Sequence, residues 1–220
     1  MAVGQRESLA GYVFEFAGTQ PVQGPNYVAQ RATIFVSRDG KTIAFTSDRS
    51  GSPSVYVVGI GGGTPERLTF HPAGAFARGW SPDGARVYYA SSRETAPSRH
   101  HRIWSVDQTG GPETLTSEQW ATNAQYSPDG RSLVIDRVRR WDKEWRVYRG
   151  GQNTPLSILK LEDNSEVLLP NPRTTDIHPL WIGDHIYFLS DRDSTMNVWR
   201  YHVPTREVAQ ITRFRGADIK

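Results

Sequence analysis

The stretch Ser81-Pro-Asp-Gly84, followed closely by Val87-Tyr-Tyr89, decides the fold because it recurs along the chain. The other copies are Ser37-Arg-Asp-Gly40 with Ile43-Ala-Phe45, Ser127-Pro-Asp-Gly130 with Leu133-Val-Ile135, and a shortened one, Gly183-Asp184 with Ile186-Tyr-Phe188. The turn aspartates Asp39, Asp83 and Asp129 lie 44 and 46 residues apart, and Asp184 follows after 55 more. A period of about 40 to 50 residues built from short strands is typical of β-propeller blades.

A second marker closes each unit in phase with the first: Leu68-Thr69, Leu115-Thr116, Leu168-Leu169 and Ile211-Thr212. Between the two markers, alternating apolar residues bounded by Gly, Pro and Asp indicate antiparallel hairpins. We therefore predict an all-β chain, a β-propeller with four recognisable four-stranded antiparallel blades. The expected units are 31–70, 75–117, 118–169 and 175–212, with an N-terminal extension or partial blade at 1–30 and the start of a next blade at 213–220.

The repeated Asp-Gly steps have two interpretations. In a tight turn, Asp bonds its own backbone and Gly adopts a positive φ without steric cost. The alternative is an acidic or metal-binding ring made by Asp39, Asp83 and Asp129. The turn interpretation is favoured, because Asp in such turns is normally satisfied locally.

Composition and motifs limit the chemistry that the chain can perform. It has no Cys, a formal net charge of +3, and basic residues mixed with 23 acidic ones, which does not demand a nucleic-acid partner. It contains no nucleophile elbow, zinc helix, phosphate loop or dinucleotide fingerprint. We predict no catalytic residue, metal or cofactor in the chain. The first 19 residues have no apolar run, so we expect neither a signal peptide nor a membrane span, and a cytoplasmic location.

An ordered set of motifs resembles the first β-propeller of tricorn-type serine proteases, from about residue 31 to the end. The motifs are Thr46-Ser-Asp-Arg-Ser-Gly51, Ser91-Ser-Arg-Glu94, Tyr148-Arg-Gly-Gly-Gln152, Trp181-Ile-Gly-Asp184 and Ile186-Tyr-Phe-Leu-Ser-Asp-Arg192. Single Ser-Pro-Asp-Gly phrases are shared with TolB-type propellers. The resemblance implies that the four blades are part of a six-bladed propeller. It departs from the family pattern in two ways: four full units are visible where the family has six blades, and Arg38 stands where the next two units have proline.

The resemblance implies a large cytosolic peptidase with two propellers, a PDZ-like domain and a C-terminal catalytic core that holds the serine and histidine. None of those catalytic residues maps onto this chain. Its implied role is to admit, filter or position peptides for that core, with peptides or neighbouring protease domains as partners. The alternative is a stand-alone TolB-like propeller that binds a protein partner. Because a chain that ends at a blade boundary exposes strand edges, we also expect self-association.

An arginine recurs in phase with the turns. Arg49, Arg93 and Arg139 each follow a turn aspartate by ten residues, and Arg192 follows Asp184 by eight. Equivalent positions of a repeat project equivalently, so these residues predict a partial ring. They could fork with carboxylates and hold blades together, which the planar guanidinium suits. They could instead bind acidic groups or peptide C-termini at one face. The first role is favoured.

The insertion at 137–152 lengthens the third unit and combines basic with aromatic residues. Its candidate contact residues are Arg139, Arg140, Trp141, Trp145 and Arg149. Such alternation can stack on nucleic-acid bases, but Asp142 and Glu144 lie in its middle and no other basic segment supports it. Arg and Trp are equally common at protein interfaces. We therefore expect this loop to contact a peptide or protein, and not nucleic acid or membrane.

Overall fold

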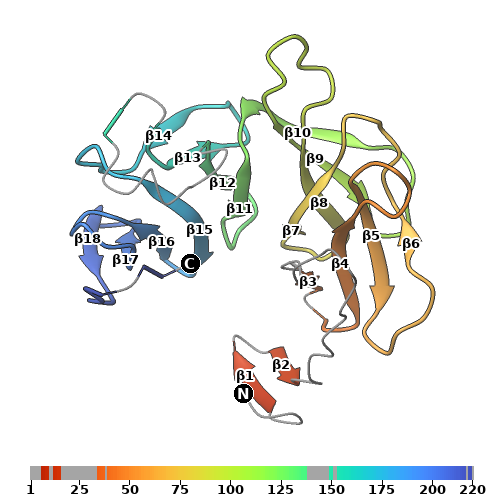
Figure 1. The fold of residues 1–220 in the computed structure, drawn as a ribbon, viewed down its shortest axis with the longest axis horizontal. Coiled ribbons are helices and arrows are strands. Elements are labelled where there is room, and N and C mark those ends of the chain that lie inside the picture. Colours follow the sequence, from red (N-terminus) through yellow and green to blue (C-terminus); the bar gives the residue numbers. More distant parts are fainter. Residues whose placement is uncertain are drawn as a thin grey trace, which may run out of the picture.

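The computed structural model describes residues 34–37, 39–137, 149–150, 153–216 and 218–219, and the backbone of two strands near the N-terminus. Those two strands, β1 (Arg6–Leu9) and β2 (Tyr12–Glu15), pair as an antiparallel hairpin. The rest of the described chain forms four antiparallel sheets of four strands each, set side by side along an arc (Figure 1). In each sheet the spatial order of the strands follows the chain, so each sheet is a simple meander.

We name the sheets blades one to four. Blade one contains β3 (Ile34–Val36), β4 (Thr42–Ser47), β5 (Ser54–Gly59) and β6 (Glu66–Arg67). Blade two contains β7 (Phe76–Trp80), β8 (Arg86–Ser91), β9 (Arg102–Asp107) and β10 (Thr114–Trp120). Blade three contains β11 (Asn123–Tyr126), β12 (Ser132–Asp136), β13 (Ser157–Lys160) and β14 (Glu166–Leu168). Blade four contains β15 (Asp176–Ile182), β16 (His185–Ser190), β17 (Asn197–His202) and β18 (Glu207–Gln210).

The second strand of each inner blade is apolar on both faces, because each face packs against a different neighbour. In β8, Val87 and Tyr89 belong to the core shared with blade one, while Tyr88 and Ala90 belong to the core shared with blade three. In a strand successive side chains point to opposite faces, so a strand buried between two sheets reads as a continuous apolar run. The repeated apolar triplets of the sequence are therefore the inter-blade cores.

Three such cores hold the four blades together. The first joins blades one and two around Val55, Leu68 and Trp104, the second joins blades two and three around Ile103 and Leu133, and the third joins blades three and four. Side chains also cross between blades: the Trp80 indole donates to the carbonyl of Phe35 at 2.9 Å. The all-β propeller fold predicted from the repeats is confirmed. No helix in the described part of the chain has the length and hydropathy of a membrane span.

The turns that connect the first and second strands of blades one to three are built alike. In blade three, the Ser127 hydroxyl donates to Asp129 Oδ1 at 2.6 Å, and the Arg131 amide donates to the same oxygen at 3.1 Å. The bond from the serine hydroxyl lowers the pKa of Asp129 below its ordinary value. The glycine that follows has a φ of 73°, which costs other residues strain. Ser37 and Ser81 make the equivalent bonds to Asp39 and Asp83, which confirms the turn interpretation of these aspartates.

Candidate functional site

The first strands of all four blades line one groove on the inner side of the arc. Its volume is about 780 Å³. The lining residues are Ile34 to Val36 of β3, Arg78 to Pro82 at β7, Tyr88 of β8, Gln125 to Pro128 at β11, and Leu180 to Gly183 at β15. The predicted inner strand before each Asp-Gly turn is therefore where the sequence places it. Equivalent strands of a propeller line its central channel, so this groove lies where that channel is expected.

The groove presents mainly apolar side chains. Ile34 is 55% exposed, and Leu180 and Ile182 are each 47% exposed. The polar groups in its wall are largely bonded to the protein: Arg78 Nε donates to the Thr122 carbonyl at 2.7 Å, and the Tyr88 hydroxyl donates to the Ala124 carbonyl at 3.1 Å. The surface left for a ligand is therefore apolar, and such exposed apolar surface in a monomer usually marks a binding site.

Arg78 brings one half-buried positive charge to the wall of the groove. Burial lowers its pKa, and the negative charge of Asp136 acts in the opposite direction. Its Nη1 also donates to the Ala77 carbonyl at 3.0 Å, so the guanidinium bridges blade two to the start of blade three. We read Arg78 as a support for the groove wall, because both bonds end on backbone carbonyls.

Gly79 lets the backbone of β7 pass over the Tyr88 ring. It lies at a register shift in the β7–β8 pairing and has a φ of 152°. A Cβ at this position would lie 2.7 Å from the Tyr88 hydroxyl oxygen, and Tyr88 is fully buried. The groove floor therefore requires glycine here.

The recurring arginines lie at the opposite end of the second strands from the Asp-Gly turns, and three of them cover a cross-strand aromatic pair. Phe45 pairs with Tyr56, Tyr89 with Trp104, and Phe188 with Trp199, in the same register of their blades. Arg49 lies 5.3 and 5.0 Å from the two ring centroids of its pair, Arg93 lies 4.1 Å from Trp104, and Arg192 lies 5.1 and 5.6 Å from its two rings. The predicted phase of the arginines thus corresponds to one repeated packing unit.

Two of these arginines also form ion pairs inside their own blade. Arg93 Nη1 pairs with Glu113, which precedes β10. Arg192 Nη2 lies 2.7 Å from Asp176 Oδ2 and 2.7 Å from the Pro170 carbonyl, and Asp176 is fully buried. These single-nitrogen ion pairs are of the kind expected of a structural role, and each joins residues of one blade and not of two blades.

Arg49 differs from the expectation that it forks with a carboxylate. It is exposed, its Nε donates to Ser47 Oγ at 3.0 Å, and within the described residues it forms no ion pair. Asp48, its neighbour in sequence, is exposed as well. In blade four the carboxylate comes from Asp176 at the start of the first strand, whereas the three residues before Ile34 in the sequence, Arg31-Ala-Thr33, include no carboxylate.

In the described part of blade three, the arginine with a carboxylate partner is Arg137, two residues before the predicted position. Arg137 donates from Nη1 and Nη2 to the two carboxylate oxygens of Glu166, at 2.5 and 2.8 Å, and lies over Trp120. This bidentate bond lowers the pKa of Glu166. The position of the aromatic pair is taken by Ile135 opposite Ser157, so the packing unit of the other blades cannot form. The sequence signal that was missed is Glu166.

The insertion is described only at its two ends. Arg149 Nη1 donates to both carboxylate oxygens of Asp191 at 3.1 Å, and Asp191, which follows β16, is fully buried. Arg149 therefore contacts the residue that precedes Arg192 in the sequence. Four of the predicted contact residues, Arg139, Arg140, Trp141 and Trp145, lie outside the described residues.

Comparison with known proteins gives a consistent set of relatives. The family model of the tricorn protease N-terminal β-propeller domain matches residues 24–220. Tricorn protease homolog 1 of Streptomyces coelicolor is 34% identical over 172 residues, which cover 73% of this chain and 15% of that protein. The crystal structure of the tricorn protease superposes with a TM-score of 0.70 at 20% identity, covering 86% of this chain and 19% of the other. TolB of Acinetobacter baumannii superposes with a TM-score of 0.67 at 18% identity, over 84% of this chain and 44% of TolB.

Proposed function

This chain belongs to the family of tricorn protease N-terminal β-propeller domains, and we propose that it is a noncatalytic module that admits or positions peptides for a catalytic core elsewhere in a longer protein. The length of the relatives supports a longer protein, because the chain spans 15% of the Streptomyces coelicolor homologue. The proposed partners are peptides and neighbouring domains of a protease.

The inner groove is the observation that carries this proposal. Its volume of about 780 Å³ falls within the range of about 300 to 1,000 Å³ that ligand pockets usually have. Ile34, Leu180 and Ile182 stay partly exposed along it, on strands from the two ends of the arc. A short peptide segment with apolar side chains would cover these residues and remove them from water, which is favourable in proportion to the apolar area buried.

The arginines fit a supporting role in this proposal. Arg93 and Arg192 have carboxylate partners in their own blades, so their charge is largely neutralised within the protein. Arg49 is exposed and keeps its charge at one end of the array. We propose that Arg49 attracts acidic groups of an approaching peptide, while the apolar groove supplies most of the affinity. Attraction of this kind falls as salt concentration rises.

The proposal is tested with fluorescently labelled peptides rich in apolar residues and the Leu180→Asp variant. In this variant, a bound apolar peptide would cover the new carboxylate and leave it without a hydrogen-bond donor or a counter-charge. We therefore expect the affinity for the peptide to fall about tenfold or more. Leu168→Asp is the matched control, because Leu168 is also a leucine exposed on a strand, at 58%, but lies on the outer strand β14. Equal loss of peptide binding in both variants, or no loss in Leu180→Asp, would contradict the proposal.

A second candidate function is a scaffold that binds a protein partner, as in the TolB-like alternative. It is favoured by two adjacent apolar residues on β14, Val167 and Leu168, which are 43% and 58% exposed. An outer strand with exposed apolar residues can pair with another chain. The same two variants separate the functions, because a partner bound at β14 is lost in Leu168→Asp and kept in Leu180→Asp.

A further inference from the structure

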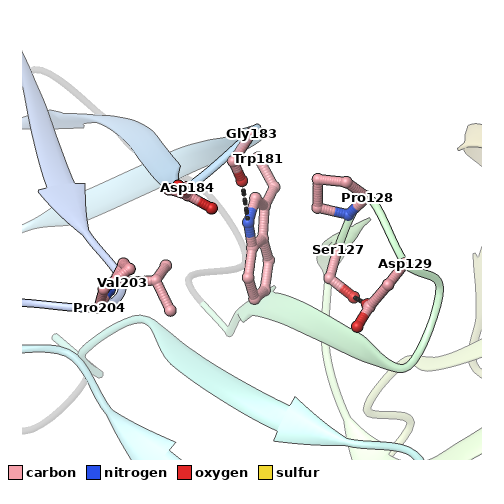
Figure 2. A pocket seen from close by; sticks show the side chains of 8 residues that line it. All are labelled: Ser127, Pro128, Asp129, Trp181, Gly183, Asp184, Val203 and Pro204. Carbon is pink, nitrogen blue, oxygen red and sulfur yellow. Dashed lines mark hydrogen bonds between the residues drawn. The ribbon is translucent and has the colours of Figure 1, made fainter.

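A second, smaller cavity lies between the turns of blades three and four (Figure 2). Its volume is about 270 Å³, below the usual range for drug-sized ligands and suited to one side chain. The lining residues are Ser127, Pro128 and Asp129 of one turn, Trp181, Gly183 and Asp184 of the other, and Val203 and Pro204 after β17. Figure 2 shows Trp181 between the two groups of residues, with Asp129 on one side and Asp184 on the other.

Trp181 gives this cavity an aromatic wall of fixed orientation. Its indole nitrogen donates to the Gly183 carbonyl at 3.1 Å, and part of the ring packs against the core of blades three and four. The loop opposite is tied to the same turn, because the Val203 amide donates to the Asp184 carbonyl at 2.9 Å. The face of an indole ring attracts cations more strongly than the faces of other aromatic side chains do.

Two carboxylates flank this ring. Both turn hydrogen bonds of Asp129 end on Oδ1, and the same bonds lower its pKa, so the group is ionised at neutral pH with Oδ2 outside the turn contacts. Asp184 is exposed, and among the described residues no donor is bonded to its carboxylate. An aromatic face with two carboxylates at its sides is complementary to a single positive charge.

The chain contains its own comparison for this arrangement. A cavity of about 380 Å³ lies between the equivalent turns of blades one and two, and it is lined by Asp39 and Asp83 with Ser37, Gly84, Ala85 and Gln108. It has two turn aspartates, like the cavity at Trp181, but no aromatic residue. The contribution of the ring can therefore be measured against an aromatic-free cavity in the same molecule.

We propose that the cavity at Trp181 binds one cationic side chain, arginine or lysine, of a peptide or protein. The inference goes beyond the proposed function, because the groove selects apolar segments and this cavity selects a positive charge. The inference is also independent of that function, because a capped single amino acid, and not a peptide, serves as the ligand in its test. Ser127, Pro128, Trp181 and Gly183 line both cavities, so a basic residue bound here would place its neighbours in sequence at the edge of the groove.

The test is titration of the ¹⁵N-labelled 220-residue chain with Nα-acetyl-arginine amide, followed by NMR of the indole N–H signals. Trp181→Phe assigns the Trp181 signal by its loss. We expect this signal to shift with the arginine probe and not with Nα-acetyl-citrulline amide, which has the same shape without the charge. Asp184→Asn should weaken binding by roughly 2- to 5-fold, as expected for an exposed interaction of this kind. Asp83→Asn should leave binding unchanged, because Asp83 lies at the aromatic-free cavity.

Three results would overturn the inference. One is an equal response to the citrulline probe, which would mean that charge is not recognised. Another is unchanged affinity in Asp184→Asn. The third is a Trp181 signal that does not shift with arginine. Affinity is measured in Asp184→Asn and not in a Trp181 variant, because Trp181 packs against a core and carries the signal that reports binding, whereas Asp184 is exposed.

Discussion

Replacing Arg192 by alanine tests whether the recurring arginines act as structural clamps. Arg192 connects two strands of blade four with the segment before them: Nε donates to Ser190 on β16 at 3.2 Å, and Nη2 contacts Asp176 on β15 and the Pro170 carbonyl before β15, each at 2.7 Å. Its side chain is 10% exposed and that of Asp176 is 0% exposed. Removing the arginine therefore leaves a fully buried carboxylate without its counter-charge.

The expected loss follows from what Asp176 retains. Removing one partner of a buried ion pair costs about 3–5 kcal/mol. Asp176 still accepts bonds from Asn171 Nδ2 at 2.8 Å and from the Thr174 hydroxyl at 3.2 Å, so the lower part of that range applies. Loss of the contact with the Phe188 and Trp199 rings adds to it. We expect the free energy of unfolding to fall by about 3 kcal/mol, or by roughly 6–12 °C in melting temperature for a chain of this size.

The assay is urea and thermal unfolding of Arg192→Ala beside Arg49→Ala. Arg49 covers the equivalent aromatic pair but is exposed and forms no ion pair within the described residues, so its loss should cost about 1 kcal/mol or less. Peptide affinity should stay unchanged in Arg192→Ala. A melting temperature within about 2 °C of wild type for Arg192→Ala, or an equal loss in both variants, would refute the clamp reasoning.

Three further predictions concern other parts of the molecule. Gly79→Ala should destabilise the chain by about 2–5 kcal/mol in urea unfolding, because the new Cβ would overlap the buried Tyr88 hydroxyl and the backbone φ is strained for alanine; a neutral effect would contradict the close approach. Arg137→Ala should lower the free energy of unfolding by about 2–3 kcal/mol, because it breaks a bidentate bond to Glu166. In the same urea experiment, Arg131→Ala at an exposed position should lower it by less than about 0.5 kcal/mol. Because the folded pKa of Asp129 is lowered below 3.8, its turn stabilises the fold fully above that pH, and the contribution shrinks as pH falls from 3.8 through the lowered value. Ser127→Ala should therefore reduce the urea midpoint more at pH 6 than at pH 3, and an equal reduction at both would contradict the assignment.

The repeats made the fold predictable because their chemistry is local. An Asp-Gly turn such as that at Asp129 bonds itself within five residues, and the apolar triplet after it requires burial on both faces. The arginine phase was predictable for the same reason. The partners of the arginines were not predictable, because Arg192 contacts Asp176, 16 residues away, and that contact depends on strand register.

Blade three differs from the other blades in the residues that the structure describes. Ile135 and Ser157 stand in place of the aromatic pair, and Arg137 contacts Glu166, while Arg139, which has the expected spacing, lies outside the described residues. The groove and the cavity at Trp181 were also beyond prediction from the sequence, since each is formed by residues of different blades. Whether Leu180 is exposed or buried depends on where the next blade lies, and no local pattern encodes that position.

Photo-cross-linking of an apolar peptide that carries a photoreactive residue tests most directly whether the inner groove is the peptide site. After irradiation and digestion, mass spectrometry locates the cross-linked residues of the chain. Our account predicts cross-links at the inner strands β7, β11 and β15, with residues such as Gln125 and Leu180, and their loss in Leu180→Asp. Cross-links confined to the outer strands β14 and β18, unchanged in Leu180→Asp, would contradict it.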